Sequence, residues 1–156
     1  MARKVMILDK TKGICEKMSQ RSEQAKDFMN KGHNCSQAVV YAFRTEIQLT
    51  EEEAINIAEK YASGTYVTCG TVLAMHIVIN GIINKTVGQM PHLYTDNTKA
   101  MIMMVDQEFN EALEALTCRK LRENNKGEGL ICTKCIEKAV QLLEEHLINS
   151  PILSLC

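Results

Sequence analysis

The chain has 156 residues, of which 46% are hydrophobic and 24% charged, and its formal net charge is −1. These values exclude collagen-like, low-complexity and wholly disordered chains. A nearly neutral chain with 4% aromatic residues and no Trp also lacks the basic field and the stacking surfaces typical of nucleic-acid binding, so we expect no nucleic-acid partner. Seven Cys and nine Met are its unusual features.

The sequence contains no segment that favours a membrane or secretion. The longest apolar stretch, residues 71–83, includes His76, Asn80 and Gly81, and it is too short and too polar for a membrane span. The N-terminal residues lack the apolar run of a secretory signal. We therefore expect a cytoplasmic protein without a membrane partner. Its cysteines should be reduced there, and they indicate thiol chemistry or metal binding more than a disulfide framework.

The first half of the chain predicts three helices, because apolar residues recur at intervals of three and four. The first runs from about residue 13 to residue 30 and ends at the Lys31-Gly32 turn. The second begins at Asn34, which can cap it together with Gln37 at the capping-box position. The third follows Thr50, and the three glutamates after Thr50 suit the positive end of a helix.

The second half predicts three more helices. The fourth runs from about residues 68–69 to 83 and is apolar on nearly all sides, as expected at the centre of a bundle. The fifth is predicted from about 98 to 121 and the sixth from about 131 to 148, with Pro151 ending it. Without a repeat or a linker, the sequence predicts an all-α fold: one domain over residues 1–156, a compact bundle of about six helices with flexible ends.

Three cysteines fall at predicted helix starts: Cys35, Cys69 and Cys132. Free backbone N–H groups and the helix dipole make this position electropositive, which favours a thiolate and lowers its pKa. Cys118 is expected near the C-terminal end of the fifth helix, where the basic residues that follow it could supply positive charge. Plain packing of small apolar side chains also accounts for each cysteine taken singly.

Residues 132–135 form a CxxC motif, Cys132-Thr133-Lys134-Cys135. Such a motif is compatible with a redox dithiol, half of a metal site, or two thiols packed on one helix face. Haem attachment is excluded because Ile136 replaces the required His, and a zinc ribbon would need a second CxxC. A four-thiolate site could assemble from the CxxC and the distant cysteines. Cys15 and Cys156 are interpreted as incidental thiols.

The cysteines also occur in a known pattern. Residues 32–39, GHNCSQAV, resemble the first block of the C-GCAxxG-C-C family, to which redox activity is attributed. Residues 69–74 resemble its CGAxxG block, although Thr71 replaces Ala and Ala74 replaces Gly. Cys118 and Cys132 match its last two cysteines, and the resemblance covers about residues 20 to 147. A related domain occurs in split-Soret cytochromes, which links the pattern to iron–sulfur chemistry.

This resemblance implies a helical protein with four functional thiolates, Cys35, Cys69, Cys118 and Cys132. Cys135, an extra thiol beside the family position, is predicted as a resolving thiol or substitute ligand. They would perform thiol redox chemistry or hold an iron–sulfur cluster, [2Fe–2S], for electron transfer. The alternatives are a non-catalytic module with a structural zinc, or a helical interaction protein with packing cysteines. Whether the protein is an enzyme stays open, and its redox partner is unknown.

Two further features bear on the site and on assembly. His76 lies seven residues after Cys69 and thus on the same helix face, where it could serve that thiol, but a hydrogen-bonded structural histidine is the more frequent role. Met101, Met103 and Met104 at helical spacing indicate core packing or an apolar interface. Together with the apolar fourth helix, this interface would suit a homodimer.

Overall fold

The computed structural model describes residues 20–61, 68–87, 93–124 and 131–148. Within these ranges all regular structure is helical apart from one isolated bridge between Thr68 and Thr117, which confirms the all-α prediction. The chain ends, for which we expected flexibility, lie outside the described residues, as do Cys15, Pro151 and Cys156.

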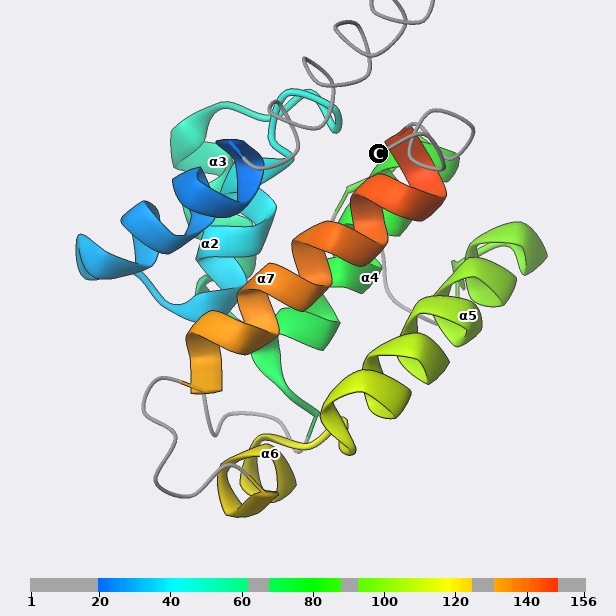
Figure 1. The fold of residues 1–156 in the computed structure, drawn as a ribbon. Coiled ribbons are helices and arrows are strands. Elements are labelled where there is room, and N and C mark those ends of the chain that lie inside the picture. Colours follow the sequence, from blue (N-terminus) through cyan, green and yellow to red (C-terminus); the bar gives the residue numbers. More distant parts are fainter. Residues whose placement is uncertain (1–19, 62–67, 88–92, 125–130, 149–156) are drawn as a thin grey trace, which may run out of the picture.

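Residues 20–30 form the first described helical segment, drawn in blue in Figure 1. The elements that follow are α2 (Cys35–Ala42), α3 (Glu51–Ala58), the 3-10 turn η1 (Glu59–Tyr61), α4 (Gly70–Ile83), α5 (Asp96–Leu113), α6 (Cys118–Asn124), α7 (Ile131–Leu143) and the π-helical segment η3 (Glu144–Ile148). The predicted sixth helix therefore exists, with its last turn widened into η3.

The predicted signals at the ends of the early helices are confirmed. Gly32 has a φ of +105°, a conformation open to glycine, and it ends the helical segment 20–30. The Asn34 side chain accepts a hydrogen bond from the Gln37 N–H at 2.7 Å, and the Gln37 side chain accepts one from the Asn34 N–H at 3.0 Å. Thr50 and Glu53 form the same reciprocal box at the start of α3.

The prediction of one fifth helix from 98 to 121 is wrong, because the chain breaks into α5 and α6. Glu114 adopts a left-handed φ of 63° directly after α5. The next residues turn towards the start of α4, where the Cys69 N–H donates to the Leu116 carbonyl at 2.8 Å. The Thr117 hydroxyl then accepts from the Lys120 N–H at 3.2 Å, and α6 begins at Cys118. Cys118 therefore lies at a helix start, not near a helix end.

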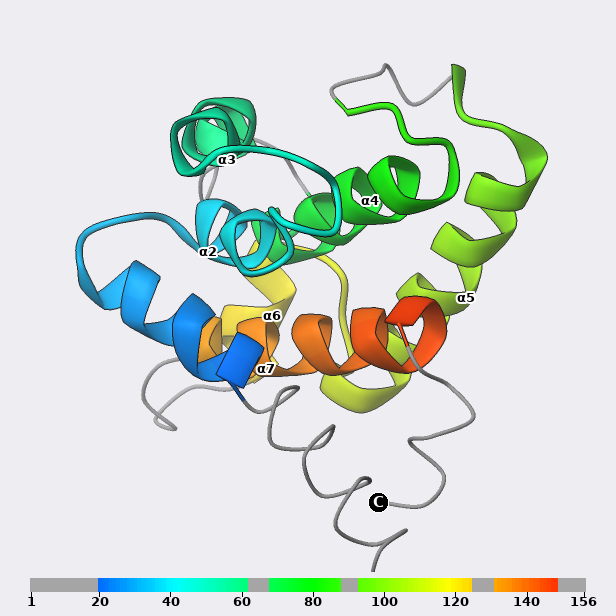
Figure 2. The same ribbon diagram turned by 90° about the horizontal axis from the view of Figure 1, so that it is seen from above.

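α4 occupies the centre of the bundle, as its apolar sequence predicts. It contacts α2, α5 and α7, and Figure 1 shows α7 crossing α4 with α2 on one side and α5 on the other. Figure 2 shows α3 outermost, then α2 and α4, then α7. Val72, Met75 and Ile79 of α4 are fully buried. In the described ranges no helix is both long and apolar enough to cross a membrane.

Candidate functional site

Four cysteines lie at the starts of three helices that contact one another. Cys35 is the first residue of α2, Cys69 is the N-cap of α4, and Cys132 and Cys135 lie in the first five residues of α7. α2, α4 and α7 are in mutual contact, so the fold brings together residues that are up to 100 positions apart in the sequence. The prediction that Cys35, Cys69 and Cys132 lie at helix starts is confirmed.

The four sulfur atoms form two hydrogen-bonded thiol pairs. The Cys35 thiol donates to the Cys132 sulfur, and the Cys135 thiol donates to the Cys69 sulfur. We call Cys35 and Cys132 the outer pair, because Cys132 is half-buried, and Cys69 and Cys135 the inner pair, because both are buried. All four are free thiols rather than disulfides.

The inner pair has its negative charge on Cys69. The hydrogen bond from Cys135 lowers the pKa of Cys69 to about 6, against the opposing effect of burial. The Thr71 hydroxyl, 2.9 Å from the Cys69 sulfur, lowers this pKa further. The Thr71 and Val72 N–H groups also face the sulfur and stabilise the thiolate, although no regular side-chain cap forms. This is the electropositive helix start that the sequence predicts.

The outer pair has its negative charge on Cys132. The hydrogen bond from Cys35 lowers the pKa of Cys132 to about 6, while burial and the nearby Cys69 oppose this shift. The positive charge of Arg122 in α6 adds to the lowering. Arg122 is one of the basic residues that follow Cys118 in the sequence, and in the structure its charge acts on Cys132.

The two donor thiols have the opposite tendency. Donation to Cys132, followed by burial and the charge of Cys69, raises the pKa of Cys35. Donation to Cys69 and burial likewise raise the pKa of Cys135. Each pair therefore combines one thiolate-prone cysteine with one cysteine held as a thiol, which is the division of roles between an attacking and a resolving thiol.

Gly70 explains why α4 can start so close to α2. A Cβ atom at this position would lie 2.5 Å from the Tyr61 carbonyl oxygen and 3.1 Å from the Cys35 sulfur. The first distance is too short for any side chain unless the backbone shifts. The Gly that follows Cys69 in the sequence is thus required by the packing of the thiol site.

Cys118, the fifth predicted site residue, is half-buried at the start of α6. It follows Thr117, which bridges to Thr68 next to Cys69, so its backbone lies beside the base of α4. Cys135, predicted as a resolving thiol or substitute ligand, pairs with Cys69. The sequence does not indicate the hydrogen bond between Thr71 and Cys69 or the effect of the Arg122 charge on Cys132, and the departure of Thr71 from the family motif is the available signal.

The two described histidines on α4 and η3 pair with carboxylates of α5. The His76 Nε2 atom lies 2.8 Å from Asp106 Oδ1, which gives it the structural role considered the more frequent one for such a residue. His146 Nε2 lies 2.5 Å from Glu108 Oε2. Both contacts join α5 to the bundle, and neither histidine is a contact of the thiol pairs.

The predicted metal sites receive no support from side-chain placement. In the parts of the chain that the structure describes, no group of three or more His, Cys, Asp or Glu side chains is arranged to hold a metal ion. The sulfurs form two pairs rather than one four-ligand group. A [2Fe–2S] cluster and a structural zinc stay predictions.

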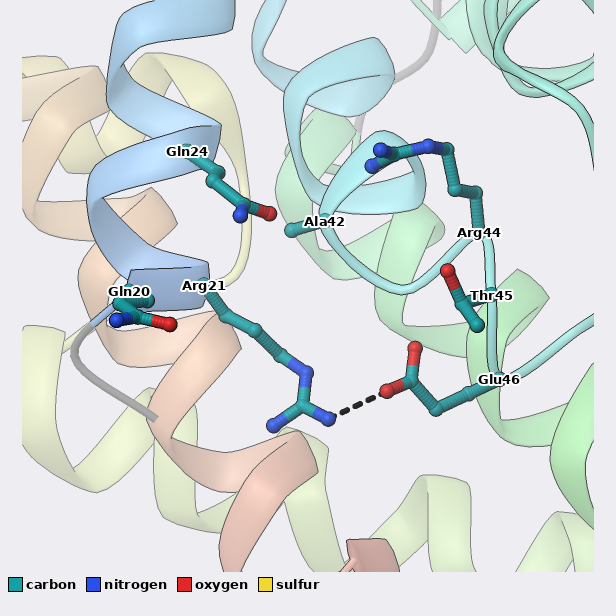
Figure 3. A pocket seen from close by; sticks show the side chains of 7 residues that line it. All are labelled: Gln20, Arg21, Gln24, Ala42, Arg44, Thr45 and Glu46. Atoms are coloured by element: carbon teal, nitrogen blue, oxygen red, sulfur yellow. Dashed lines mark hydrogen bonds and ion pairs between the residues drawn. The ribbon is translucent and has the colours of Figure 1, made fainter. Parts of the chain in front are cut away.

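A cavity of about 220 Å³ lies at the other end of α2, lined in part by Arg21, Ala42 and Glu46. Figure 3 shows Arg21 hydrogen-bonded to Glu46 across it. Apart from Ala42 its lining side chains are polar, and none is a thiol, so it does not serve as an entrance to the cysteine pairs.

The fold and the site define a class: a helical protein with thiol pairs at the starts of packed helices. A family model described as "Putative redox-active protein (C_GCAxxG_C_C)" matches residues 33–146. This match covers well over half of the chain, and the protein belongs to this family. No curated protein and no solved structure gives a significant match.

Proposed function

We propose that the protein is a thiol–disulfide redox protein that uses its cysteines directly. The observation that carries this proposal is the division within each pair: Cys132 and Cys69 favour the thiolate, while Cys35 and Cys135 are held as thiols. Thiolate is the attacking species in disulfide exchange, and a neighbouring thiol is needed to release the product.

In the reaction, the Cys132 thiolate attacks one sulfur of an external disulfide. The S–S bond breaks, one thiolate leaves and takes up a proton, and a mixed disulfide forms on Cys132. Cys35 then loses its proton and attacks the Cys132 sulfur, which releases the second product thiol and leaves a Cys35–Cys132 disulfide. Two electrons have passed from the pair to the external disulfide; Cys35 supplies one of the two protons taken up by the product thiols, and solvent supplies the other.

The rate advantage that a lowered pKa gives Cys132 depends on the pH at which the reaction is measured. With a pKa of about 6, Cys132 is roughly half thiolate at pH 6, against about 0.3% for an ordinary thiol of pKa 8.5. A thiolate of lower pKa is less nucleophilic. With a Brønsted coefficient of 0.4–0.5, the rate of attack per thiolate falls roughly tenfold or more, which offsets part of the gain in thiolate concentration. The net increase in the rate of attack by Cys132 over an ordinary thiol is about tenfold at pH 6 and only about twofold at pH 7.

The test is alkylation of the reduced full-length protein with iodoacetamide from pH 5 to pH 9, with each cysteine followed by mass spectrometry. We expect Cys132 to react with a midpoint near pH 6, and glutathione disulfide to convert Cys35 and Cys132 into a disulfide. If neither occurs, thiol exchange is not the function. Iron and acid-labile sulfide are measured first on protein purified without oxygen.

That metal measurement separates the remaining candidates. Stoichiometric iron with sulfide would favour electron transfer through a cluster, and zinc without sulfide would favour the structural module. The family membership supports redox activity in general, and the thiol pairs favour direct exchange among its forms.

A further inference from the structure

We propose that the two thiol pairs form a relay, in which Cys132 is the entry point and the buried inner pair stores the disulfide. This inference rests on the proposed function and adds a second pair, an order of events and a capacity of four electrons for external disulfides.

The burial of the sulfurs determines the order. Cys69 is 6% exposed and Cys135 is 3% exposed, so neither can meet a disulfide on another molecule. Cys35 is 7% exposed, and Cys132 is the half-buried member of the four. An external disulfide can therefore reach the inner pair only after exchange at Cys132.

The position of Cys69 links the inner pair to the outer pair. Its charge acts on Cys35 as well as on Cys132, so the inner thiolate lies close to both members of the outer pair. Gly70 lets α4 approach the Cys35 sulfur without a side chain between them. A thiolate adjacent to a newly formed disulfide is the arrangement needed for exchange inside the protein.

The relay step neither gains nor loses electrons. After the outer disulfide has formed, the Cys69 thiolate attacks one of its sulfurs and breaks the Cys35–Cys132 bond. Cys135 loses its proton and attacks Cys69, so that a Cys69–Cys135 disulfide forms and the outer pair returns to a Cys35 thiol and a Cys132 thiolate. The one proton lost by Cys135 is the one gained by Cys35. A second equivalent of external disulfide can then oxidise the outer pair again, which gives two disulfides and four electrons in total.

The burial of the inner pair has a simpler explanation in packing alone, and the relay makes different predictions from it. If the inner pair served only for packing, both of its thiols would stay unreactive towards disulfides. The relay requires that the inner pair be oxidised rapidly, and only through Cys132.

The experiment adds glutathione disulfide to the reduced full-length protein, first one equivalent and then a second. Samples are quenched in acid over time, alkylated and mapped by mass spectrometry. We expect the first equivalent to end as a Cys69–Cys135 disulfide with Cys132 free again, and the second to end as a Cys35–Cys132 disulfide.

Serine variants test the order. Cys132→Ser should slow oxidation of the inner pair by 50-fold or more, because the entry point is lost. Cys135→Ser should reduce the disulfide consumed from two equivalents to one, held as Cys35–Cys132. Circular dichroism verifies folding. Because Cys132 is half-buried, its variant keeps the test valid even if replacement of a buried cysteine prevents folding.

Two results would overturn the relay while leaving the proposed function intact. One is inner-pair oxidation at the wild-type rate in Cys132→Ser; the other is an inner pair that stays reduced in the presence of excess disulfide while the outer pair is oxidised. A wild-type outer pair that never reacts with glutathione disulfide would instead contradict the proposed function itself.

Discussion

At the two ends of α2 and α7, the pKa values of acidic groups are shifted in opposite directions. Both helices begin at the thiol site, with Cys35 and Cys132, and both end near a partly buried ion-pair cluster formed by Arg21, Glu46 and Glu144. At the first end, the pKa of Cys132 is lowered to about 6; at the second, the pKa of Glu144 is raised to about 7.

The difference lies in the groups that face each charge. Burial opposes ionisation at both ends, but the thiolates receive hydrogen bonds from neighbouring thiols, a hydroxyl and N–H groups at helix starts. Glu144 is 2% exposed, and its burial, with the negative charges of Glu46 and Glu145, outweighs the lowering of its pKa by Arg21. Its contact with Arg21, at 3.5 Å, is an ion pair without a regular hydrogen bond to Oε2. Burial alone therefore does not decide the ionisation of a group; the donors around it do.

The largest expected effect comes from Gly70→Ala, which would disrupt the thiol end alone. The added methyl group would meet the Tyr61 carbonyl and the Cys35 sulfur, and we expect a loss of about 2–3 kcal/mol in the free energy of unfolding. The rate of Cys35–Cys132 disulfide formation should fall as well, because α4 is displaced from α2. Urea unfolding and the glutathione disulfide reaction measure the two effects.

Gly81→Ala is the matched control for this variant. Its methyl group would meet the Ile47 side chain, at 2.6 Å, at a place remote in sequence from every paired cysteine. We expect it to reduce stability while leaving the rate of disulfide formation unchanged. An equal loss of rate in both variants would show that the effect of Gly70→Ala is a general loss of stability.

The second prediction concerns the ion-pair end. Burial raises the pKa of Glu144 to about 7, so the folded protein binds a proton between about pH 4.5 and pH 7 that the unfolded chain has released. The contribution of Glu144 to stability therefore falls as the pH rises through this window. Glu144→Gln, which resembles the protonated acid, should be about 1–3 kcal/mol more stable than the wild type at pH 8.

At pH 5 that advantage should disappear, since the wild-type carboxyl is then protonated. Urea unfolding at pH 5 and pH 8 under reducing conditions measures the difference. A stability change of the same size at both pH values would mean that the variant acts through packing or through the loss of the Arg21 ion pair.

The third prediction separates the hydroxyl of Thr71 from the other donors at Cys69. Thr71→Val removes the hydroxyl at nearly constant volume and should raise the pKa of Cys69 by about 0.5–1 unit. Thiolate absorbance near 240 nm against pH, measured in a Cys132→Ser background, reports this pKa. Thr71→Ser keeps a hydroxyl and should keep the pKa; an equal shift in both variants would exclude the hydroxyl as the cause.

Much of the fold follows from local signals in the sequence. The capping boxes at Asn34 and Thr50 and the turn at Gly32 mark helix boundaries that depend on residues within a few positions, and they are confirmed. The break between α5 and α6 depends on the hydrogen bond from Cys69 to Leu116, a contact between distant segments, and no local pattern indicates it.

The same distinction applies to the site. The helix-start positions of Cys35, Cys69 and Cys132 follow from sequence, because a helix start is a local feature. The pairing does not, because it depends on how α2, α4 and α7 pack. The family pattern therefore favours Cys118 over Cys135, although the packing gives Cys135 the hydrogen bond to Cys69.

The smallest expected effect concerns Arg122, whose charge lies outside the hydrogen-bonded pairs. Arg122→Gln should raise the pKa of Cys132 by a few tenths of a unit, roughly 0.2–0.5, because the arginine is exposed to solvent and screened. The pH dependence of iodoacetamide alkylation at Cys132 measures this shift, and 0.5 M salt should reduce the difference between the variant and the wild type. Arg119→Gln, the same charge change on the same helix, is the matched control: Arg119 is paired with Glu123 at 3.3 Å, and its side chain is 91% exposed. Equal shifts in both variants would mean that Cys132 senses the total charge of α6; a shift in Arg122→Gln alone would show that a single, specifically placed charge distinguishes the thiol end of α7 from its carboxylate end.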